Sequence, residues 1–426
     1  MNTVEYQKFL SILKEEMVPA MGCTEPIAIA YAASKAKDIL QEEVVRLEAF
    51  CSGNIIKNTK CVIVPNTGNL IGIEASAIIG ILAGNTAREL EVIAEVSDEA
   101  IAKTKELVKQ DFCQVNLLDT NRVLHIVIKA YGENHSCSVE IQDAHTHITK
   151  IQYDDQTIFE EEGNEKYLGS FTDRSCLSLE KIYHFANTCE LEDIKFLVQR
   201  QIQYNMAIAN EGLTGNYGIG LGKVLLETGE NSVFTQMKAY TAAASEARMC
   251  GCSLPVVTNS GSGNQGITCS VPVIVYAKEK NKTKEQLWRT LVFSNLMTIH
   301  QKTRIGRLSA FCGAVSAACA AGCAISYIEN ASIQQLRNTI TNTLADIPGI
   351  VCDGAKATCA AKIATSVDAA MMAHQLAMRN RVYDSTLGIL KEDIESTISA
   401  VGYLGKYGMK ETDEEILNIM LDTWEK

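Results

Sequence analysis

Two cysteines late in the chain, Cys352 and Cys359, stand at either end of the stretch CDGAKATC. The Pro-Gly pair before them predicts a turn, and Asp353 is a good N-cap for a helix over Ala355–Met378. Seven residues of straight helix span about 10.5 Å, but a cysteine in a loop can curl back toward a partner inside the helix. The stretch therefore suits two thiolates aimed at one point beside a helix N-terminus, where anions are favoured. The alternative is that both are small buried hydrophobes.

Three further cysteines, Cys312, Cys319 and Cys323, share one face of a predicted helix by their spacing. They form either a structural stripe of small residues or a set from which one member joins Cys352 and Cys359. Spacing alone does not choose among the three.

Cys23, in the stretch MGCTEP, lies at or just before the N-terminus of an Ala-rich helix predicted over Ile27–Leu40. Such a position lowers the pKa of a thiol, which makes Cys23 a candidate for catalysis. The alternative is an ordinary capping turn that uses the Thr24 side chain.

Two turn-rich segments could bind a substrate. The first, SGSGNQG at 260–266, precedes a helix predicted over Ile267–Lys278 and combines glycines with neutral hydrogen-bond donors. It has neither the Rossmann glycine pattern nor a Walker lysine, so a small carboxylate fits it better than a nucleotide phosphate. The alternative is an ordinary loop between helices. In the second, SGNIIKN at 52–58, Lys57 either binds a substrate carboxylate or is solvated.

Composition narrows the classes of function. Lys and Arg number 39 against 51 Asp and Glu, and the net charge of −12 argues against binding to nucleic acids or anionic membranes. The first residues lack the basic and apolar regions of a signal peptide, so we expect the fifteen cysteines to be reduced, in the cytoplasm, with metal or catalytic roles. The seven histidines form no HxxH or HExxH pattern, which gives a zinc hydrolase little support. The uncharged segment Leu308–Ile328 is long enough to span a bilayer, but its small residues predict a buried helix instead.

The elements that must position these residues fall into two groups. Strands and helices alternate after residue 43, whereas the chain from Ser178 onward reads almost entirely as helix with Gly-rich breaks. We therefore expect an α+β fold in which a mainly helical catalytic domain carries an inserted α+β sandwich domain. The expected division is 1–43 (N-terminal helices joining the catalytic domain), 44–165 (α+β domain) and 166–426 (helical catalytic domain). The predicted elements of the first two parts are helices over 4–18, 27–40, 70–83 and 97–110, strands over 44–52, 115–118, 122–131, 136–143 and 146–153, an irregular segment over 53–65 and an exposed linker at 160–164.

Five motifs stand in order along the chain: GCTEPIAIA at 22–30, SGNIIKN at 52–58, SGSGNQGI at 260–267, IGRLSAFCG at 305–313 and PGIVCDGAKATC at 348–359. Together they resemble the iron–sulfur L-cysteine desulfidase family, which is related to the α-chain of the bacterial iron–sulfur L-serine dehydratases. The resemblance runs over essentially the whole chain, and it implies the helical serine-dehydratase-α-like catalytic domain expected above.

The resemblance implies a [4Fe–4S] cluster held by three cysteines, which match Cys312, Cys352 and Cys359, and no pyridoxal phosphate (PLP). It also implies a catalytic cysteine at Cys23. The other two cysteines of the predicted helix fall outside the matched positions, which favours structural roles for them.

Other candidate residues come from the motifs around these cysteines. The candidate catalytic residues are Cys23, Thr24, Glu25 and Lys57. The candidate substrate-binding residues are Asn54, Ser262, Gly263, Asn264 and Gln265.

The expected reaction follows from the number of ligands. Fe–S clusters are usually held by four thiolates, so three leave one iron open as a Lewis acid that can bind a leaving group. A base, for which Cys23 is the candidate, removes the α-proton of a small L-amino acid while its β-substituent departs. L-cysteine would give pyruvate, ammonia and hydrogen sulfide, and L-serine would give pyruvate and ammonia.

We expect an L-cysteine desulfidase, with an iron–sulfur L-serine dehydratase as the alternative. A rival from another class is a non-catalytic iron–sulfur sensor or scaffold. A sensor is expected to saturate its cluster and to carry an element that binds DNA or a protein partner, and the acidic charge counts against it. The expected partner is thus a small amino-acid substrate, without nucleic acid or membrane, and a homodimer is one option for assembly.

Overall fold

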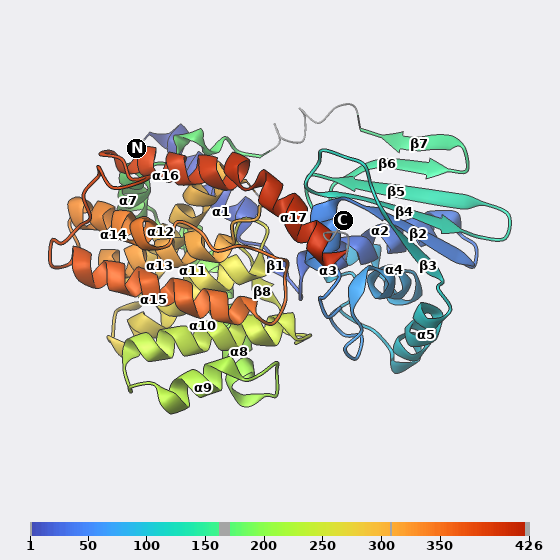
Figure 1. The fold of residues 1–426 in the computed structure, drawn as a ribbon, viewed down its shortest axis with the longest axis horizontal. Helices are drawn as coiled ribbons and strands as arrows, with labels where there is room; N and C mark the ends of the chain where they lie inside the picture. The colour runs from blue at the N-terminus through green and yellow to red at the C-terminus, as the bar shows by residue number, and fades with distance from the viewer. Residues whose placement is uncertain (1, 162–170, 307–308, 422–426) are drawn as a thin grey trace.

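Helices make up most of this computed structural model, and a mixed sheet stands on one side of them (Figure 1). The structure describes residues 2–161, 171–306 and 309–421. The expected α+β fold class is confirmed, because a six-stranded sheet lies between the first helices and the long helical part of the chain. The predicted linker at 160–164 lies largely outside the described residues.

The large sheet has the strand order β3-β2-β4-β5-β6-β7, with β2 and β3 parallel and the other neighbours antiparallel. Alternate residues of β4 and β5 are buried, so the sheet presents one apolar face. Helices α2 and α4 cover that face (Figure 1). The strands are β2 (Arg46–Cys51), β3 (Cys113–Leu117), β4 (His125–Tyr131), β5 (Ser136–Gln142), β6 (Ile148–Tyr153) and β7 (Gln156–Glu160), and the helices on this side are α2 (Thr24–Leu40), α3 (Gly53–Thr59), α4 (Gly72–Ala83), a 3₁₀ turn (Thr86–Glu91) and α5 (Asp98–Lys109).

The helical part is built around α13, which lies among α11, α12, α14 and α15. Small residues allow this packing, because a Cβ added to Gly322 of α13 would lie only 2.8 Å from the Ala370 oxygen of α15. Within the described residues no helix is long and apolar enough to cross a membrane. The helices are α7 (Leu179–Thr188), α8 (Leu191–Thr214), α9 (Leu221–Thr228), α10 (Val233–Met249), α11 (Gly263–Glu279), α12 (Lys284–Ile305), α13 (Gly313–Ile328), α14 (Ile333–Asp346), α15 (Cys359–Ala377), α16 (Ile394–Tyr403) and α17 (Lys410–Met420), with short turns of helix at Arg174–Cys176 and Leu404–Gly408.

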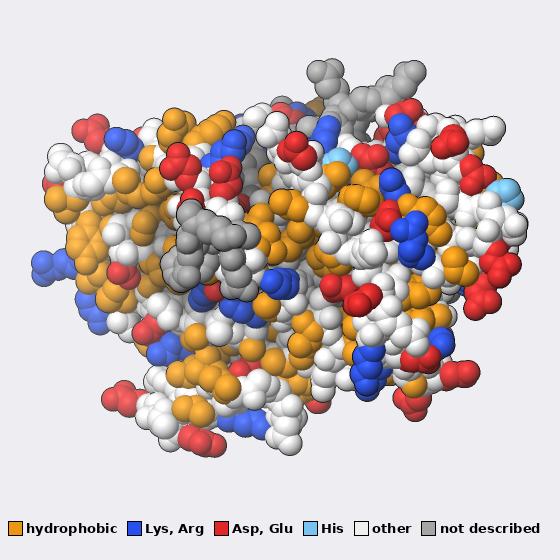
Figure 2. Space-filling view, turned by 45° about the vertical axis from the view of Figure 1, so that its right-hand side comes forward, with side chains coloured by type: hydrophobic (Ala, Val, Ile, Leu, Met, Phe, Trp, Pro, Cys, Tyr) orange, Lys and Arg blue, Asp and Glu red, His pale blue; other side chains and the backbone are white. Residues whose placement is uncertain are grey.

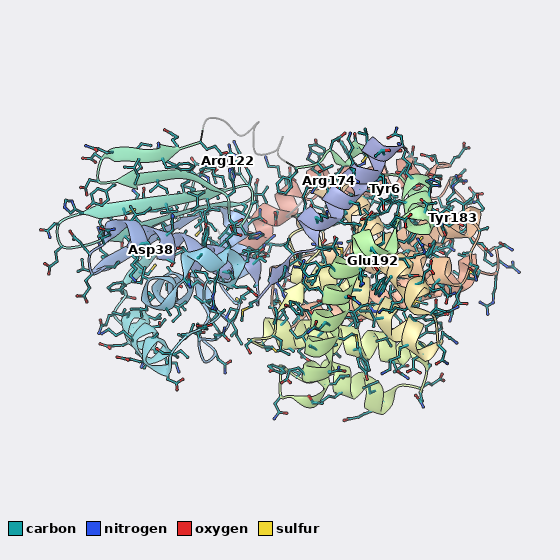
Figure 3. The ribbon with its side chains drawn as sticks, turned by 180° about the vertical axis from the view of Figure 1, so that it is seen from behind. Tyr6, Asp38, Arg122, Arg174, Tyr183 and Glu192 are labelled. Carbon is teal, nitrogen blue, oxygen red and sulfur yellow. The ribbon has the colours of Figure 1, made fainter. Side chains whose placement is uncertain are left out.

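The two N-terminal helices pack on different sides of the molecule. Helix α1 (Thr3–Glu16) packs in the helical part, where Arg174 forms ion pairs with Glu15 at 3.0 Å and Glu16 at 2.6 Å (Figure 3). Helix α2 packs on the sheet and on α4, because its alanine-rich face allows close approach. Between them, β1 (Pro19–Ala20) pairs with β8 (Val256–Val257) of the helical part.

The far end of the chain also joins the two parts. Helices α16 and α17 run across the molecule toward α3 (Figure 1). A Cβ added to Gly53 of α3 would lie 2.6 Å from Leu417, and the Lys60 ammonium donates to the Met420 oxygen at 2.6 Å. On the face drawn in Figure 2, acidic and basic side chains are interspersed.

Four local features differ from the predictions. Residues 53–59, which were expected to be irregular, form α3, whose apolar residues are buried against the sheet part. Strand β7 was not predicted, and its five residues are all exposed, so it lacks the buried alternation that marks a strand in a sequence. Helix α15 begins at Cys359 instead of Ala355, and helix α11 begins at Gly263 instead of Ile267.

Candidate active site

Cys312 and Cys352 are held side by side by a short antiparallel backbone pair. The Cys312 amide donates to the Ile350 oxygen at 2.8 Å, and the Cys352 amide donates to the Ala310 oxygen at 2.7 Å. The two thiols hydrogen-bond to each other, and this contact raises the pKa of Cys312 and lowers that of Cys352 to about 6. These cysteines come from two of the matched motifs, which the fold places in contact.

Cys359 is the first residue of α15, not one to two turns inside a helix as predicted. Residues 353–358 form a turn because Asp353 does not cap the helix. Its carboxylate instead pairs with the ammonium groups of Lys356 and Lys362, each at 2.5 Å. Burial raises the pKa of Asp353, but these two lysines outweigh it and hold the pKa at about 2. The turn thus brings Cys359 back toward Cys352, whose charge adds to the effect of burial in raising the pKa of Cys359.

Cys23 is the N-cap of α2 and packs in one buried cluster with Cys359. Its thiol donates a hydrogen bond to Glu25 Oε2 at 2.9 Å. Burial, together with the Glu25 carboxyl group, raises the pKa of Cys23 well above its ordinary value, although Arg248 opposes the shift. The predicted lowering of this pKa is therefore wrong, because desolvation outweighs the favourable position at the helix N-terminus.

The neighbours of Cys23 hold the Glu25 carboxyl group. Asn58 Nδ2 donates to Glu25 Oε1 at 3.2 Å, and the Thr24 hydroxyl lies 3.1 Å from Glu25 Oε2 and 3.3 Å from the Gly261 oxygen. Thr24 is the first residue of α2 and not its cap, so the capping turn proposed as an alternative does not form. The second contact of Thr24 ties α2 to the SGSGNQG segment.

The SGSGNQG segment forms the N-terminus of α11. Ser262 is the N-cap, without a side-chain capping bond, and Gly263 is the first helical residue. Asn264 Oδ1 accepts hydrogen bonds from Ser245 Oγ at 3.2 Å and from Arg248 Nη1 at 3.1 Å. Gln265 lies against Gly313, the residue after Cys312, and its Oε1 atom is buried without a hydrogen-bond partner.

The N-termini of four helices therefore meet at one place. Helix α2 begins after Cys23, α11 begins at Gly263, α13 begins after Cys312, and α15 begins at Cys359. The contacts described above join these ends to one another. Each helix N-terminus carries a partial positive charge, so the region favours thiolates and other anions.

Lys57 lies beside this region but is not solvated. It belongs to α3, its side chain is 2% exposed, and its ammonium group forms an ion pair with Asp413 of α17. Its charge helps to lower the pKa of Cys352. A Cβ added to Gly354 would lie 2.3 Å from the Lys57 oxygen, so the cysteine loop passes directly against α3. Asn54, in the first turn of α3, has a buried Oδ1 atom without a hydrogen-bond partner.

Sequence reasoning missed three residues of this region: Asn58, Arg248 and Asp413. Asn58 and Asp413 hold the predicted residues Glu25 and Lys57. Arg248 is 3% exposed, and burial lowers its pKa against the opposing effects of Cys23 and Glu25. A signal for Arg248 was present, because it is an isolated arginine in the small-residue helix segment TAAASEARM.

Residues 87–418 match the serine dehydratase alpha chain family. The chain belongs to this family. The UPF0597 proteins of Desulfitobacterium hafniense and Lachnoclostridium phytofermentans are each 48% identical over 417 residues, which cover 98% of this chain and 97% and 100% of those proteins. The UPF0597 protein of Treponema denticola is 46% identical over 423 residues, 98% of both chains.

The three matched cysteines are the residues that would hold an iron–sulfur cluster in this member of the serine dehydratase alpha chain family. In the described parts of the chain, no three His, Cys, Asp or Glu side chains meet around a single ion position. A [4Fe–4S] cluster does not require such a position, because each thiolate ligand binds a different iron atom. Three thiols that perturb one another's pKa, gathered at positive helix ends, suit a soft and anionic group. The chemistry of these three thiols therefore fits a cluster.

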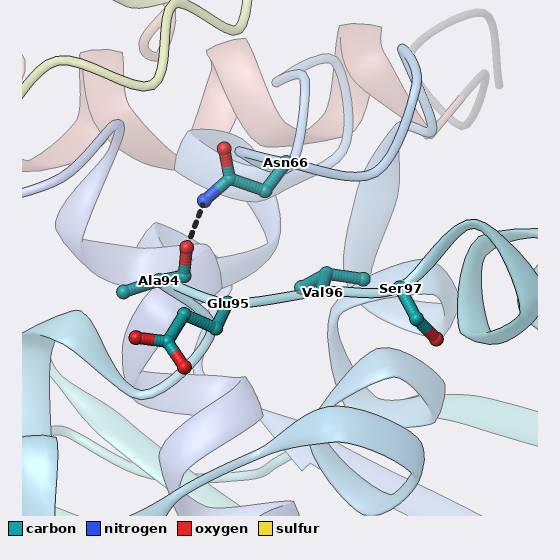
Figure 4. A pocket seen from close by; sticks show the side chains of 5 residues that line it. All are labelled: Asn66, Ala94, Glu95, Val96 and Ser97. Carbon is teal, nitrogen blue, oxygen red and sulfur yellow. Dashed lines mark hydrogen bonds between the residues drawn. The ribbon is translucent and has the colours of Figure 1, made fainter.

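A recess of about 610 Å³ beside α5 is a separate feature (Figure 4). Its lining contains neither a cysteine nor a cation, and Asn66 is already bonded to the Ile93 and Ala94 oxygens. It therefore lacks the groups that the family's chemistry would need. The lining residues are Asn66, Ala94, Glu95, Val96 and Ser97.

Proposed function

We propose that this chain is a PLP-independent iron–sulfur lyase that catalyses β-elimination from a small L-amino acid, with L-cysteine as the preferred substrate. The observation that carries the proposal is the gathering of four cysteines where four helix N-termini meet, with Cys312 and Cys352 in contact and Cys359 packed against Cys23. The likeness of the whole chain to single-chain desulfidases supports L-cysteine. The family match alone supports the coarser class of dehydratase-like lyases.

Cys312, Cys352 and Cys359 are the residues that would hold a [4Fe–4S] cluster. With three protein thiolates, such a cluster supplies an open iron that acts as a Lewis acid toward the β-substituent of the substrate. The pairing of the Cys312 and Cys352 backbones fixes two of the thiols before any metal binds.

Cys23 and Glu25 supply the proton chemistry. Because burial keeps the Cys23 thiol protonated, its proton must first pass to Glu25 Oε2, to which it is already hydrogen-bonded. The resulting thiolate then takes the α-proton of the substrate. Asn58 and Thr24 keep the Glu25 carboxyl group oriented during this exchange.

The elimination balances as follows for L-cysteine. The Cα–H bond breaks with transfer of the proton to Cys23 Sγ, a carbon–carbon double bond forms, and the electron pair of the Cβ–S bond leaves with sulfur. The departing HS⁻ takes the proton that Glu25 had accepted from Cys23, which gives hydrogen sulfide and restores the resting state of both residues. The other product, 2-aminoacrylate, is hydrolysed to pyruvate and ammonia. For L-serine the departing hydroxide takes the same proton and leaves as water, and this second candidate function is favoured by the name of the matching family.

The test is anaerobic reconstitution with iron and sulfide, followed by measurement of pyruvate and sulfide release from L-cysteine and of pyruvate release from L-serine. We expect the cluster to form and L-cysteine to react faster. Faster pyruvate formation from L-serine would assign the chain as a dehydratase.

Ligand variants separate the cluster from the fold. Cys352→Ala and Cys359→Ala should lose bound iron, whereas Cys319→Ala, which removes a buried thiol in the α13 core, should keep it. Equal iron content in all three variants would contradict the assigned ligands.

A further inference from the structure

Arg248 is a buried cation at the candidate active site whose charge is not neutralised by an ion pair. Its side chain is 3% exposed, at the C-terminal end of α10. Nη1 donates to Asn264 Oδ1 at 3.1 Å, but Nε has no hydrogen-bond partner. Within the described residues no carboxylate oxygen lies within 4.0 Å of the guanidinium group, although Cys23, which also interacts with it through a hydrogen bond, and Glu25 are near enough to favour its charged form and raise its pKa against burial. A buried charge is tolerated only when it is paired, so this position calls for an anion.

The Arg248 side chain lies against the N-terminus of α11. A Cβ added to Gly263, the first residue of that helix, would lie 2.3 Å from Arg248 Nε. The guanidinium group therefore packs directly on the backbone of Gly263, and a side chain at this position would displace it from the helix N-terminus. A helix N-terminus and a guanidinium fork both favour a carboxylate, which can accept two parallel hydrogen bonds from arginine.

A second unpartnered atom, of opposite character, belongs to the first turn of the same helix. Gln265 of α11 lies against Gly313, and its buried Oε1 atom accepts no hydrogen bond. An amide oxygen is a pure acceptor and suits an ammonium group. Arg248, which packs on Gly263, and Gln265 thus offer a donor and an acceptor near the N-terminus of α11, which matches the two charged ends of an α-amino acid.

We propose that Arg248 binds the α-carboxylate of the amino-acid substrate, in place of Lys57. Lys57 is already paired with Asp413, whereas Arg248 holds an uncommitted donor between Cys23 and the α11 N-terminus. Gln265 Oε1 accepts from the α-ammonium group. This inference rests on the proposed function for the identity of the substrate, but binding of the carboxylate does not depend on elimination.

The test compares two non-reacting ligands, L-alanine and L-alaninamide, which differ in the carboxylate. Their binding to the full-length protein without and with a reconstituted cluster is measured by titration calorimetry or by saturation-transfer NMR. The wild-type protein should prefer L-alanine, and Arg248→Gln should abolish this preference, with a loss of about 100-fold or more in kcat/KM for the reacting amino acid. Arg248→Lys keeps the charge but not the fork and should recover part of the preference.

Controls separate binding from structure. Arg200→Gln removes another arginine with a buried, unpartnered Nε, on α8, and should leave the preference unchanged. If the role of Arg248 were purely structural, Arg248→Gln would lower the affinity for L-alanine and for L-alaninamide equally. Should Arg248→Gln fail to fold, Asn264→Ala removes the group that holds Nη1, and it should reduce the preference for L-alanine.

The outcomes for the two proposals are distinct. Equal binding of L-alanine and L-alaninamide by the wild-type protein, or an unchanged preference in a folded Arg248→Gln variant, would overturn the role of Arg248 even if pyruvate forms. If Arg248→Gln loses the preference but the reconstituted wild-type protein forms no pyruvate from L-cysteine or L-serine, the role of Arg248 in binding is supported and the proposed lyase activity is overturned.

Discussion

Cys23 shows how the environment of a residue can reverse what its sequence position suggests. A helix N-terminus stabilises a thiolate, yet Cys23 is buried and hydrogen-bonded to Glu25, and its pKa is raised. A base that is protonated at rest needs a partner to accept its proton. Glu25 has that position, so the chemistry belongs to the pair and not to Cys23 alone.

We predict that Cys23→Ala lowers kcat by about 1000-fold or more, while the reconstituted protein keeps the visible absorption of its cluster. The reason is that Cys23 lies beside the proposed ligands but is assigned to proton transfer. Turnover and the absorption spectrum are measured on the same preparation.

Cys176→Ala is the matched control, because this half-buried thiol lies outside the candidate site, with its Sγ bonded to the Asp173 oxygen. It should keep both activity and absorption. Full activity in Cys23→Ala would remove Cys23 from the mechanism, and loss of its absorption would make it a ligand.

At the scale of elements, α17 completes the surroundings of Lys57. The Lys57 ammonium is buried, and its counter-charge, Asp413, comes from a helix more than 350 residues away in the chain. Leu417 of the same helix covers Gly53. Helix α3 is therefore stabilised by α17 as well as by its own sequence.

We predict that Asp413→Asn lowers the free energy of unfolding by about 2 kcal/mol, because it leaves a buried ammonium group unpaired. Urea unfolding measures the change. The control is Glu5→Gln, which breaks the surface pair with Lys181 and should have little effect on the free energy of unfolding, because solvent screens an exposed pair. Adding Lys57→Met to Asp413→Asn should restore part of the loss, since the unpaired charge is then gone. Equal effects of Asp413→Asn and Glu5→Gln would contradict the importance of this pair.

Elements with regular patterns could be predicted from the sequence, and elements that depend on distant partners could not. The alternation of β4 and β5 and the small-residue composition of α13 were sufficient to predict those elements. Helix α3 was missed because Ser52, Gly53 and Asn54 are turn formers and its partner α17 is remote. The start of α15 was predicted too early because the Asp353 carboxylate pairs with two lysines and does not cap the helix.

The candidate site was predictable in its cysteines but not in its charges. The cysteines belong to motifs that can be recognised in the sequence, and the fold brings those motifs together. Nothing in local sequence places Arg248 opposite Gly263 or Asp413 opposite Lys57, because such contacts depend on how whole helices cross.

At the scale of the whole molecule, one buried histidine should make stability depend on pH. His374 of α15 hydrogen-bonds Ser326 of α13 at 2.8 Å, and burial lowers its pKa from 6.5 to about 4. Between these values the unfolded chain binds a proton that the folded chain does not. Stability from this group is therefore complete above about pH 6.5 and is lost as the pH falls toward about 4.

We predict that lowering the pH from about 7 to about 5 costs the wild-type protein about 2 kcal/mol through His374. His374→Gln should have a correspondingly smaller loss over the same range, whatever its stability at neutral pH. The measurement is urea unfolding of both proteins at both pH values. Identical losses would show that His374 is protonated in the folded protein at pH 5.

The meeting of four helix N-termini has a consequence for how the site comes into being during folding. The four helices begin at residues 24, 263, 313 and 359, so no hairpin or neighbouring pair of elements contains the site. Closing such long loops has an entropic cost that contacts within single helices do not offset. The three assigned ligands lie within residues 312–359, so they can meet once α13, α14 and α15 have packed together. Cys23 comes from α2 and joins them only when the helical part has closed on the sheet part. Acquisition of a metal cluster would then report on folding of the helical part, and turnover would report on closure of the two parts.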